Sequence, residues 1–173
     1  MQKALEYEPA NADIYGQLGI IYFRSRNYEG SIPALKCAIR GCSGEDSCLG
    51  RGLDRCYPDL GENPVDVKGQ AISPNTIVYY YTYGSVLSAL SRPRDNKCGE
   101  AMQVLHEVRV ELDKNPEAYA DARDTILNKI VEPSEFICQS LAQDVAPVTS
   151  VPGEAVTSTP ETGIYDMTAT PSQ

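Results

Sequence analysis

Near the start of the chain, three large residues and one small residue recur at helical spacing and constrain the fold most strongly: Tyr15, Leu18, Gly19 and Tyr22. Positions three, four and seven residues apart lie on one face of an α-helix. A glycine inside an isolated helix costs about 1 kcal/mol relative to alanine. We therefore expect Gly19 where a second helix packs closely, and the pattern predicts a pair of antiparallel helices.

The helices of this pair are expected over about 11–25, with Asn11 as the N-terminal cap, and over about 28–40. The second helix carries Ser31, Leu35 and Ala38 at the same helical spacing, and Ala38 follows Ala4 by one period of 34 residues. A second copy of the pattern follows, in Tyr80, Tyr83, Gly84 and Leu87, and then in Ala101, Leu105 and Val108. Two copies of one pattern predict a stack of helix pairs.

This pattern resembles the tetratricopeptide repeat, whose consensus is W-x2-L-G-x2-Y, then A-x3-F, then P. The likeness covers about 1–43 and 77–116, and the second copy departs from it by Tyr83 in place of Leu and by a longer turn. The resemblance implies an all-α fold made of antiparallel helix pairs of a solenoid. The Cys-rich insertion and the Thr/Pro tail look like those of exported or membrane-attached bacterial repeat proteins.

The expected organisation has four parts. Residues 1–43 would hold the end of one repeat and one nearly complete repeat, 44–73 an irregular Cys/Gly-rich loop insertion, 74–144 a degenerate repeat with capping helices, and 145–173 a disordered tail rich in Thr, Pro and Ser. Because the first repeat begins in its second helix, we expect this chain to be the C-terminal portion of a longer array.

A C-terminal capping helix is expected over about 115–131. It begins with Pro116 in its first turn, where proline is well tolerated. We expect Pro133 to end this helix and to open a short final helix through Phe136, Ile137 and Leu141.

The resemblance also implies a concave groove lined by the first helix of each pair. Carried over position by position, the groove residues would be Asp13, Gly16, Ile20, Phe23, Arg24, Val78, Tyr81, Ser85 and Ser88. Chaperone-binding members use Lys and Asn there to hold a peptide's C-terminal carboxylate. Gly16 and Ile20 stand at those positions here, so we expect no such clamp.

A run of tyrosines, Tyr79-Tyr80-Tyr81-x-Tyr83, begins the second copy. On a helix, Tyr80 and Tyr83 would point into the core, Tyr81 into the groove, and Tyr79 elsewhere. The expected function is a protein–protein interaction scaffold that binds a peptide or partner helix in this groove. The alternative is a non-catalytic accessory region of a larger exported or membrane-attached enzyme.

Six cysteines admit three interpretations: Cys37, Cys42, Cys48, Cys56, Cys98 and Cys138. Cys98 opens a helix and the next helix runs back antiparallel, so Cys138 can reach Cys98, and the other four allow three disulfide connectivities. A four-thiolate zinc site fits poorly, because structural zinc usually shows closer Cys-x2–4-Cys spacing. Free thiols acting as small apolar residues are the third possibility.

The disulfide interpretation implies an oxidising setting, hence an extracytoplasmic or cell-surface location, and the other two interpretations leave a cytoplasmic location possible.

A net charge of −9 argues against nucleic acid as a partner. There is no run of about 18 apolar residues, so we expect no membrane insertion of this segment. His106, the only histidine, is expected at the surface. We expect no catalytic residue, cofactor or metal site, and a protein or peptide as partner.

Overall fold

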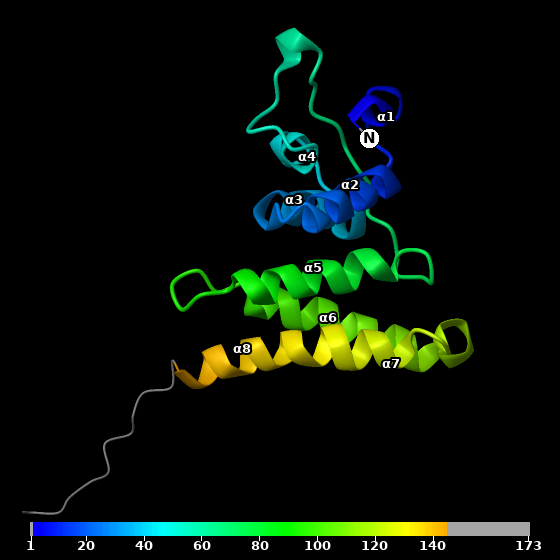
Figure 1. The fold of residues 1–173 in the computed structure, drawn as a ribbon. Helices are drawn as coiled ribbons and strands as arrows, with labels where there is room; N and C mark the ends of the chain where they lie inside the picture. The colour runs from blue at the N-terminus through cyan, green and yellow to red at the C-terminus, as the bar shows by residue number, and fades with distance from the viewer. Residues whose placement is uncertain (1, 145–173) are drawn as a thin grey trace, which may run out of the picture.

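The computed structural model describes residues 2–144, and the expected tail at 145–173 lies outside the described residues. Over 2–144 the regular structure is helical, with isolated β-bridges and no strand (Figure 1). The elements are α1 (Gln2–Tyr7), α2 (Ala12–Arg24), α3 (Tyr28–Arg40), α4 (Glu45–Gly50), η1 (Pro58–Leu60), α5 (Ile77–Leu90), α6 (Cys98–Lys114), η2 (Pro116–Tyr119), α7 (Arg123–Ile126), η3 (Leu127–Val131) and α8 (Glu132–Asp144). The all-α prediction is confirmed for this part of the chain.

Helices α2 and α3 form a pair with nearly the bounds that the sequence indicates. The side-chain oxygen of Asn11 accepts a hydrogen bond from the N–H of Asp13 at 3.0 Å, so the expected cap is confirmed. Asn27 caps α3 in the same way, by accepting from the N–H of Gly30 at 3.0 Å. Between them, Arg26 adopts a φ of 65°, the left-handed conformation that reverses the chain.

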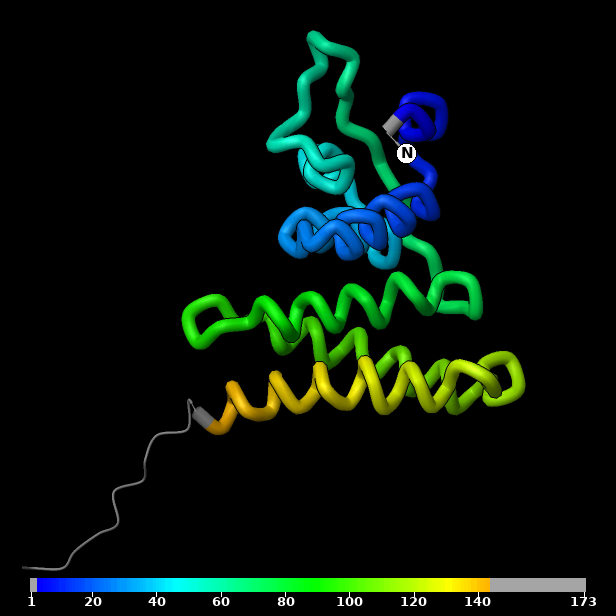
Figure 2. Tube along the Cα trace, viewed as in Figure 1, coloured from blue at the N-terminus to red at the C-terminus, as the bar shows by residue number. Residues whose placement is uncertain are grey.

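The helices are stacked in successive layers (Figures 1 and 2). Helix α2 packs on α3, both pack on α5, α5 packs on α6, and α8 packs on α5 and α6. One apolar core runs through all of these layers. Its largest fully buried side chains are Tyr15, Leu35, Tyr83, Leu87, Leu105 and Leu112. Each helix pair therefore buries its apolar face against the next one.

Two glycines occupy equivalent places in the two helix pairs. A Cβ atom built on Gly19 of α2 would lie 2.5 Å from Cγ of Leu35 on α3. One built on Gly84 of α5 would lie 2.7 Å from Cγ of Leu105 on α6. The expected close approach of a second helix at Gly19 is thus confirmed, and the second pair repeats it.

The insertion is less irregular than expected, because it contains helix α4 and the short helix η1. Glu45 and Asp46 occupy the first turn of α4, where carboxylates favour a helix N-terminus. The helix packs on α3. At the base of the insertion, Cys42 and Val67 exchange backbone hydrogen bonds of 3.0 and 2.7 Å. The expectation of a helix-free segment was wrong, since α4 is too short to show helical periodicity.

The C-terminal helices also differ from expectation. The chain turns through η2, and then α7, η3 and α8 follow one another without a break, so Pro133 does not end a helix. The π turn η3 ends at Val131, two residues before Pro133. A proline ring in a regular helix clashes with the carbonyl four residues earlier, and here that residue, Lys129, lies inside the π turn. Further along, Glu135 accepts two hydrogen bonds from Arg109 of α6, at 2.9 and 2.6 Å.

Candidate partner-binding groove

Most residues predicted to line a groove lie on α2 and α5, two helices that pack on each other. Ile20 and Phe23 of α2 are half-buried and Arg24 is exposed. Tyr81 and Ser85 of α5 are half-buried as well. Burial raises the pKa of Tyr81 above its ordinary value, and the nearby charge of Arg24 opposes that rise. The structure thus places Arg24 near Tyr81, on two helices that pack on each other.

At Gly16, which was also predicted to line the groove, the ring of Tyr79 from α5 lies on α2. A Cβ atom on Gly16 would lie 2.5 Å from the ring of Tyr79, so only glycine leaves this space free. The Tyr79 hydroxyl donates a hydrogen bond of 2.8 Å to Oδ1 of Asp13. Burial, and then this hydrogen bond, raises the pKa of Tyr79 strongly. The prediction that Tyr79 points elsewhere than the core was wrong, because Gly16 of α2 leaves space for its ring.

Ser88 was predicted to line the groove, but it lies in the core. It is fully buried, its hydroxyl donates to the carbonyl of Gly84 at 2.9 Å, and Cys138 of α8 lies 3.5 Å from it. Val78 remains half-buried at the packed edge of the core. Helix α8 covers this stretch of α5, which the sequence could not show because the path of the chain after Pro133 was mispredicted.

One aromatic residue beside Phe23 was not predicted from the sequence. The ring of Tyr28, at the start of α3, lies 5.7 Å from the ring of Phe23 between centroids, in a tilted arrangement. Tyr28 remains 40% exposed. Its position at the start of the second helix gave no sign of this contact, since the contact depends on how the chain reverses at Arg26.

The six cysteines lie in three pairs at disulfide distance. They are Cys37–Cys42, Cys48–Cys56 and Cys98–Cys138, with Cα–Cα separations of 4.8, 5.2 and 5.3 Å. The expected Cys98–Cys138 pair is therefore present, and one of the three connectivities is selected for the other four. Among residues 2–144, no cluster of His, Cys, Asp or Glu is placed to hold a metal ion. Three separate cysteine pairs are the arrangement expected of disulfides, and they are compatible with an oxidising location.

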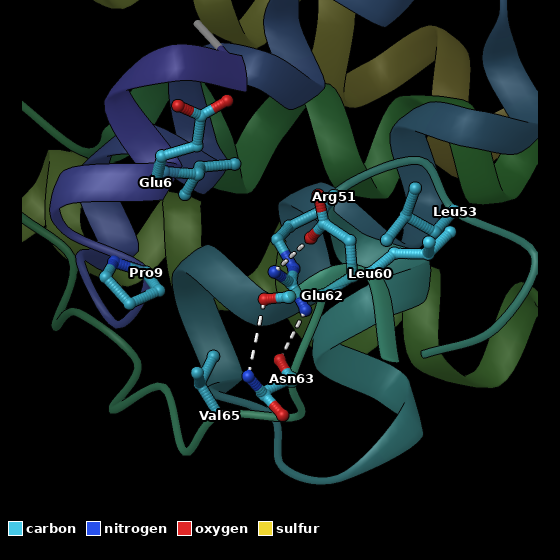
Figure 3. Close-up of a pocket in the computed structure, with 10 residues that line it drawn as sticks. Glu6, Pro9, Arg51, Leu53, Leu60, Glu62, Asn63 and Val65 are labelled. Carbon is cyan, nitrogen blue, oxygen red and sulfur yellow. Dashed lines mark hydrogen bonds and ion pairs between the residues drawn. The ribbon is translucent and has the colours of Figure 1, made fainter. Parts of the chain in front are cut away.

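A hollow of about 560 Å³ lies apart from the groove, between α1 and the insertion (Figure 3). Its lining comes from α1 and the turn after it and from the loop that follows α4: Leu5, Glu6, Pro9, Arg51, Leu53, Leu60, Gly61, Glu62, Asn63 and Val65. The hollow could not be predicted from the sequence, because no periodic pattern links α1 to residues 51–65. A second hollow follows the outer face of α8 around Phe136, which is 69% exposed.

The single histidine, His106, is exposed on α6, as expected. Within residues 2–144, no helix has both the length and the apolar character needed to cross a bilayer. Comparison of the chain with protein-family models, with curated proteins and with solved structures gives no match. The groove, the hollow and the cysteine pairs are therefore interpreted from their own chemistry.

Proposed function

We propose that this chain is a protein-interaction scaffold that binds a peptide or a partner helix in the groove between α2 and α5. One observation carries the proposal: α2 presents the half-buried Ile20 and Phe23 and the exposed Arg24, and α5, which packs on it, presents the half-buried Tyr81 and Ser85. Aromatic and arginine side chains contribute most to binding energy at protein interfaces. The repeat-like spacing of the two helix pairs, and the contacts of each pair with the next, support the proposal further.

The chemistry of the groove indicates the kind of segment that it would accept. The Tyr79 ring fills the end next to Gly16, so the ligand would occupy the half near Phe23 and Tyr81. That half offers apolar and aromatic surface together with the exposed cation of Arg24. A segment with one large apolar side chain and an acidic group beside it fits this combination. An extracytoplasmic location belongs to the same proposal and is supported by the three cysteine pairs.

The test uses peptides selected by phage display on the oxidised protein. Binding of each selected peptide is then measured by fluorescence anisotropy. For peptides that bind the groove, Tyr81→Ala should weaken affinity roughly tenfold, which corresponds to about 1.4 kcal/mol, with a small change in melting temperature. The matched control is Tyr7→Ala, because Tyr7 is 86% exposed on α1, away from the groove.

Two results would refute the proposal. The first is that every selected peptide binds Tyr81→Ala as tightly as the unchanged protein. The second is that Tyr81→Ala loses much of its stability, which would make Tyr81 a core residue instead of a contact residue.

A further inference from the structure

We propose that the hollow between α1 and residues 51–65 is a second docking site, which takes a basic peptide segment carrying a long aliphatic side chain. This site is separate from the groove and does not depend on the function proposed for it. Three properties of the hollow support the inference: the apolar part of its walls, the rigidity of its floor, and the sign of the charge around its mouth.

About half of the surface that lines the hollow is apolar. Leu5 of α1 is buried and Pro9 follows the same helix, while Leu53, Leu60 and Val65 come from the insertion (Figure 3). Its volume of about 560 Å³ lies within the range of sites that bind small ligands or peptide side chains. The hollow can therefore accommodate a large aliphatic side chain together with part of its backbone.

Leu60 lies at the rim and extends the apolar part of the walls. It ends helix η1 and is 79% exposed. Gly61 follows with a φ of 84°, in the left-handed conformation that turns the chain back. A large aliphatic side chain held at the rim of a partly apolar hollow offers surface that a docked segment would cover.

The floor of the hollow is fixed by the buried side chain of Arg51. Its guanidinium donates to Oε2 of Glu62 at 2.7 Å and to the carbonyl of Asn63 at 2.6 Å, and its Nη2 lies 2.9 Å from Sγ of Cys48. Val65 is held as well, because its N–H donates to Oγ of Ser47 at 3.0 Å. These contacts hold the loop to α4, so the hollow exists before any ligand arrives and binding costs little ordering.

The charge that a ligand meets is negative. Arg51 is buried and its charge is already paired with Glu62, so its cation offers little to an anionic partner. Glu62 is 40% exposed in its side chain and uses only one carboxylate oxygen for Arg51, and Glu6 is exposed on the facing wall. Residues 2–9 and 44–66 carry eight acidic and three basic side chains, a net charge of −5 out of the chain's −9. Such a field attracts cationic segments and repels acidic ones.

The test measures binding of short fluorescein-labelled peptides that carry a central leucine flanked by lysines, by glutamates or by serines. Anisotropy is recorded with the whole oxidised chain. The lysine peptide should bind more tightly than the serine peptide, the glutamate peptide should bind least, and higher salt should weaken the lysine peptide. Leu60→Ser should weaken the lysine peptide about tenfold or more, since the exposed rim side chain is removed.

Two variants act as controls. Phe136→Ser removes a similarly exposed apolar side chain from the outer face of α8 and should leave binding of the lysine peptide unchanged. Tyr81→Ala should also leave it unchanged, so failure at the hollow and failure at the groove are told apart. Glu6→Lys changes an exposed residue on α1 and should weaken the lysine peptide even if Leu60→Ser does not fold.

Three results would overturn the inference. Equal binding of the lysine and glutamate peptides would show that charge does not select the ligand. Unchanged binding of the lysine peptide to both Leu60→Ser and Glu6→Lys would place its site elsewhere. A dimer of the unchanged protein that becomes monomeric in Leu60→Ser would show that a second copy of this chain covers the hollow, instead of a basic segment.

Discussion

Replacing Gly19 by alanine is expected to destabilise the fold, although the same change stabilises most helices. The added methyl group would lie 2.5 Å from Cγ and 2.8 Å from Cδ2 of Leu35, and 3.1 Å from the backbone nitrogen of that residue. The closest atom is the branching carbon of Leu35, and the backbone behind it prevents a simple withdrawal. Helices α2 and α3 must therefore move apart or distort to admit the methyl group.

The magnitude follows from two opposing contributions. Overpacking of a tight core costs about 1–3 kcal/mol, and alanine gains about 1 kcal/mol of helix propensity over glycine. For Gly19→Ala the blocked retreat of Leu35 puts the cost near the upper end, so we expect a net loss of about 2 kcal/mol. For Gly84→Ala the facing backbone atom, the carbonyl oxygen of Ala101, is 3.5 Å away, so Leu105 can yield and the net loss should be about 1 kcal/mol.

The assay is urea unfolding of the oxidised protein, followed by circular dichroism. Gly99→Ala is the matched control: it lies in the first turn of α6, where no heavy atom would lie within 4 Å of an added Cβ. This control should leave the free energy of unfolding unchanged or raise it slightly. A net loss of about 2 kcal/mol corresponds to a fall of about 6 °C in melting temperature for a chain of this size. If Gly19→Ala proves as stable as Gly99→Ala, the close helix contact at Gly19 is not what stabilises the pair.

Two further predictions concern the cysteines and the tyrosines. Thiol titration of the denatured protein, taken from its native compartment, should find free thiols only after reduction, and six free thiols before reduction would contradict the pairing. Replacing Cys98 and Cys138 by alanine should lower the free energy of unfolding in urea by about 4 kcal/mol, because the pair closes a loop with a sequence separation of 40. Burial, and then a hydrogen bond to a carboxylate, raises the pKa values of Tyr83 and Tyr119. The unfolded state therefore loses these protons first, and the free energy of unfolding should fall as the pH rises above about 10. The fall should be shallower in Tyr83→Phe, and an equally steep fall in that variant would contradict this explanation.

The first helix pair could be predicted from the sequence because local and tertiary preferences agree there. Asn11 and Asn27 are good N-terminal caps, and Tyr15, Leu18 and Leu35 at helical spacing form one apolar face. The structure places all three of these apolar side chains in the core. Spacing also predicted the Cys98–Cys138 pair, since antiparallel helices return the chain to the level where it started.

Features that depend on contacts between distant segments could not be predicted. The ring of Tyr79 is buried because α2 carries Gly16 opposite it, and no pattern within α5 shows this. The pairing of Cys37 with Cys42 depends on the chain reversing just after α3 and on Val67 returning to pair with Cys42. The continuation of the helix through Pro133 depends on the π turn before it. In these cases, the conformation depends on a contact with a segment far along the chain or on a local change of helix type, and the local sequence shows neither.

The Cys98–Cys138 pair has a mechanical consequence. If the chain is stretched from both ends, tension passing back along α8 from Asp144 reaches Cys138 and crosses the sulfur bridge to Cys98 at the start of α6. The peptide between these two cysteines, with most of α6 and all of α7 and η3, lies outside this path and bears no load while the bridge is intact. Pulling would therefore extend the α2–α3 layer and α5 first. The loop between Cys98 and Cys138 would extend only after a reducing agent breaks the bridge, as a separate and later increase in length.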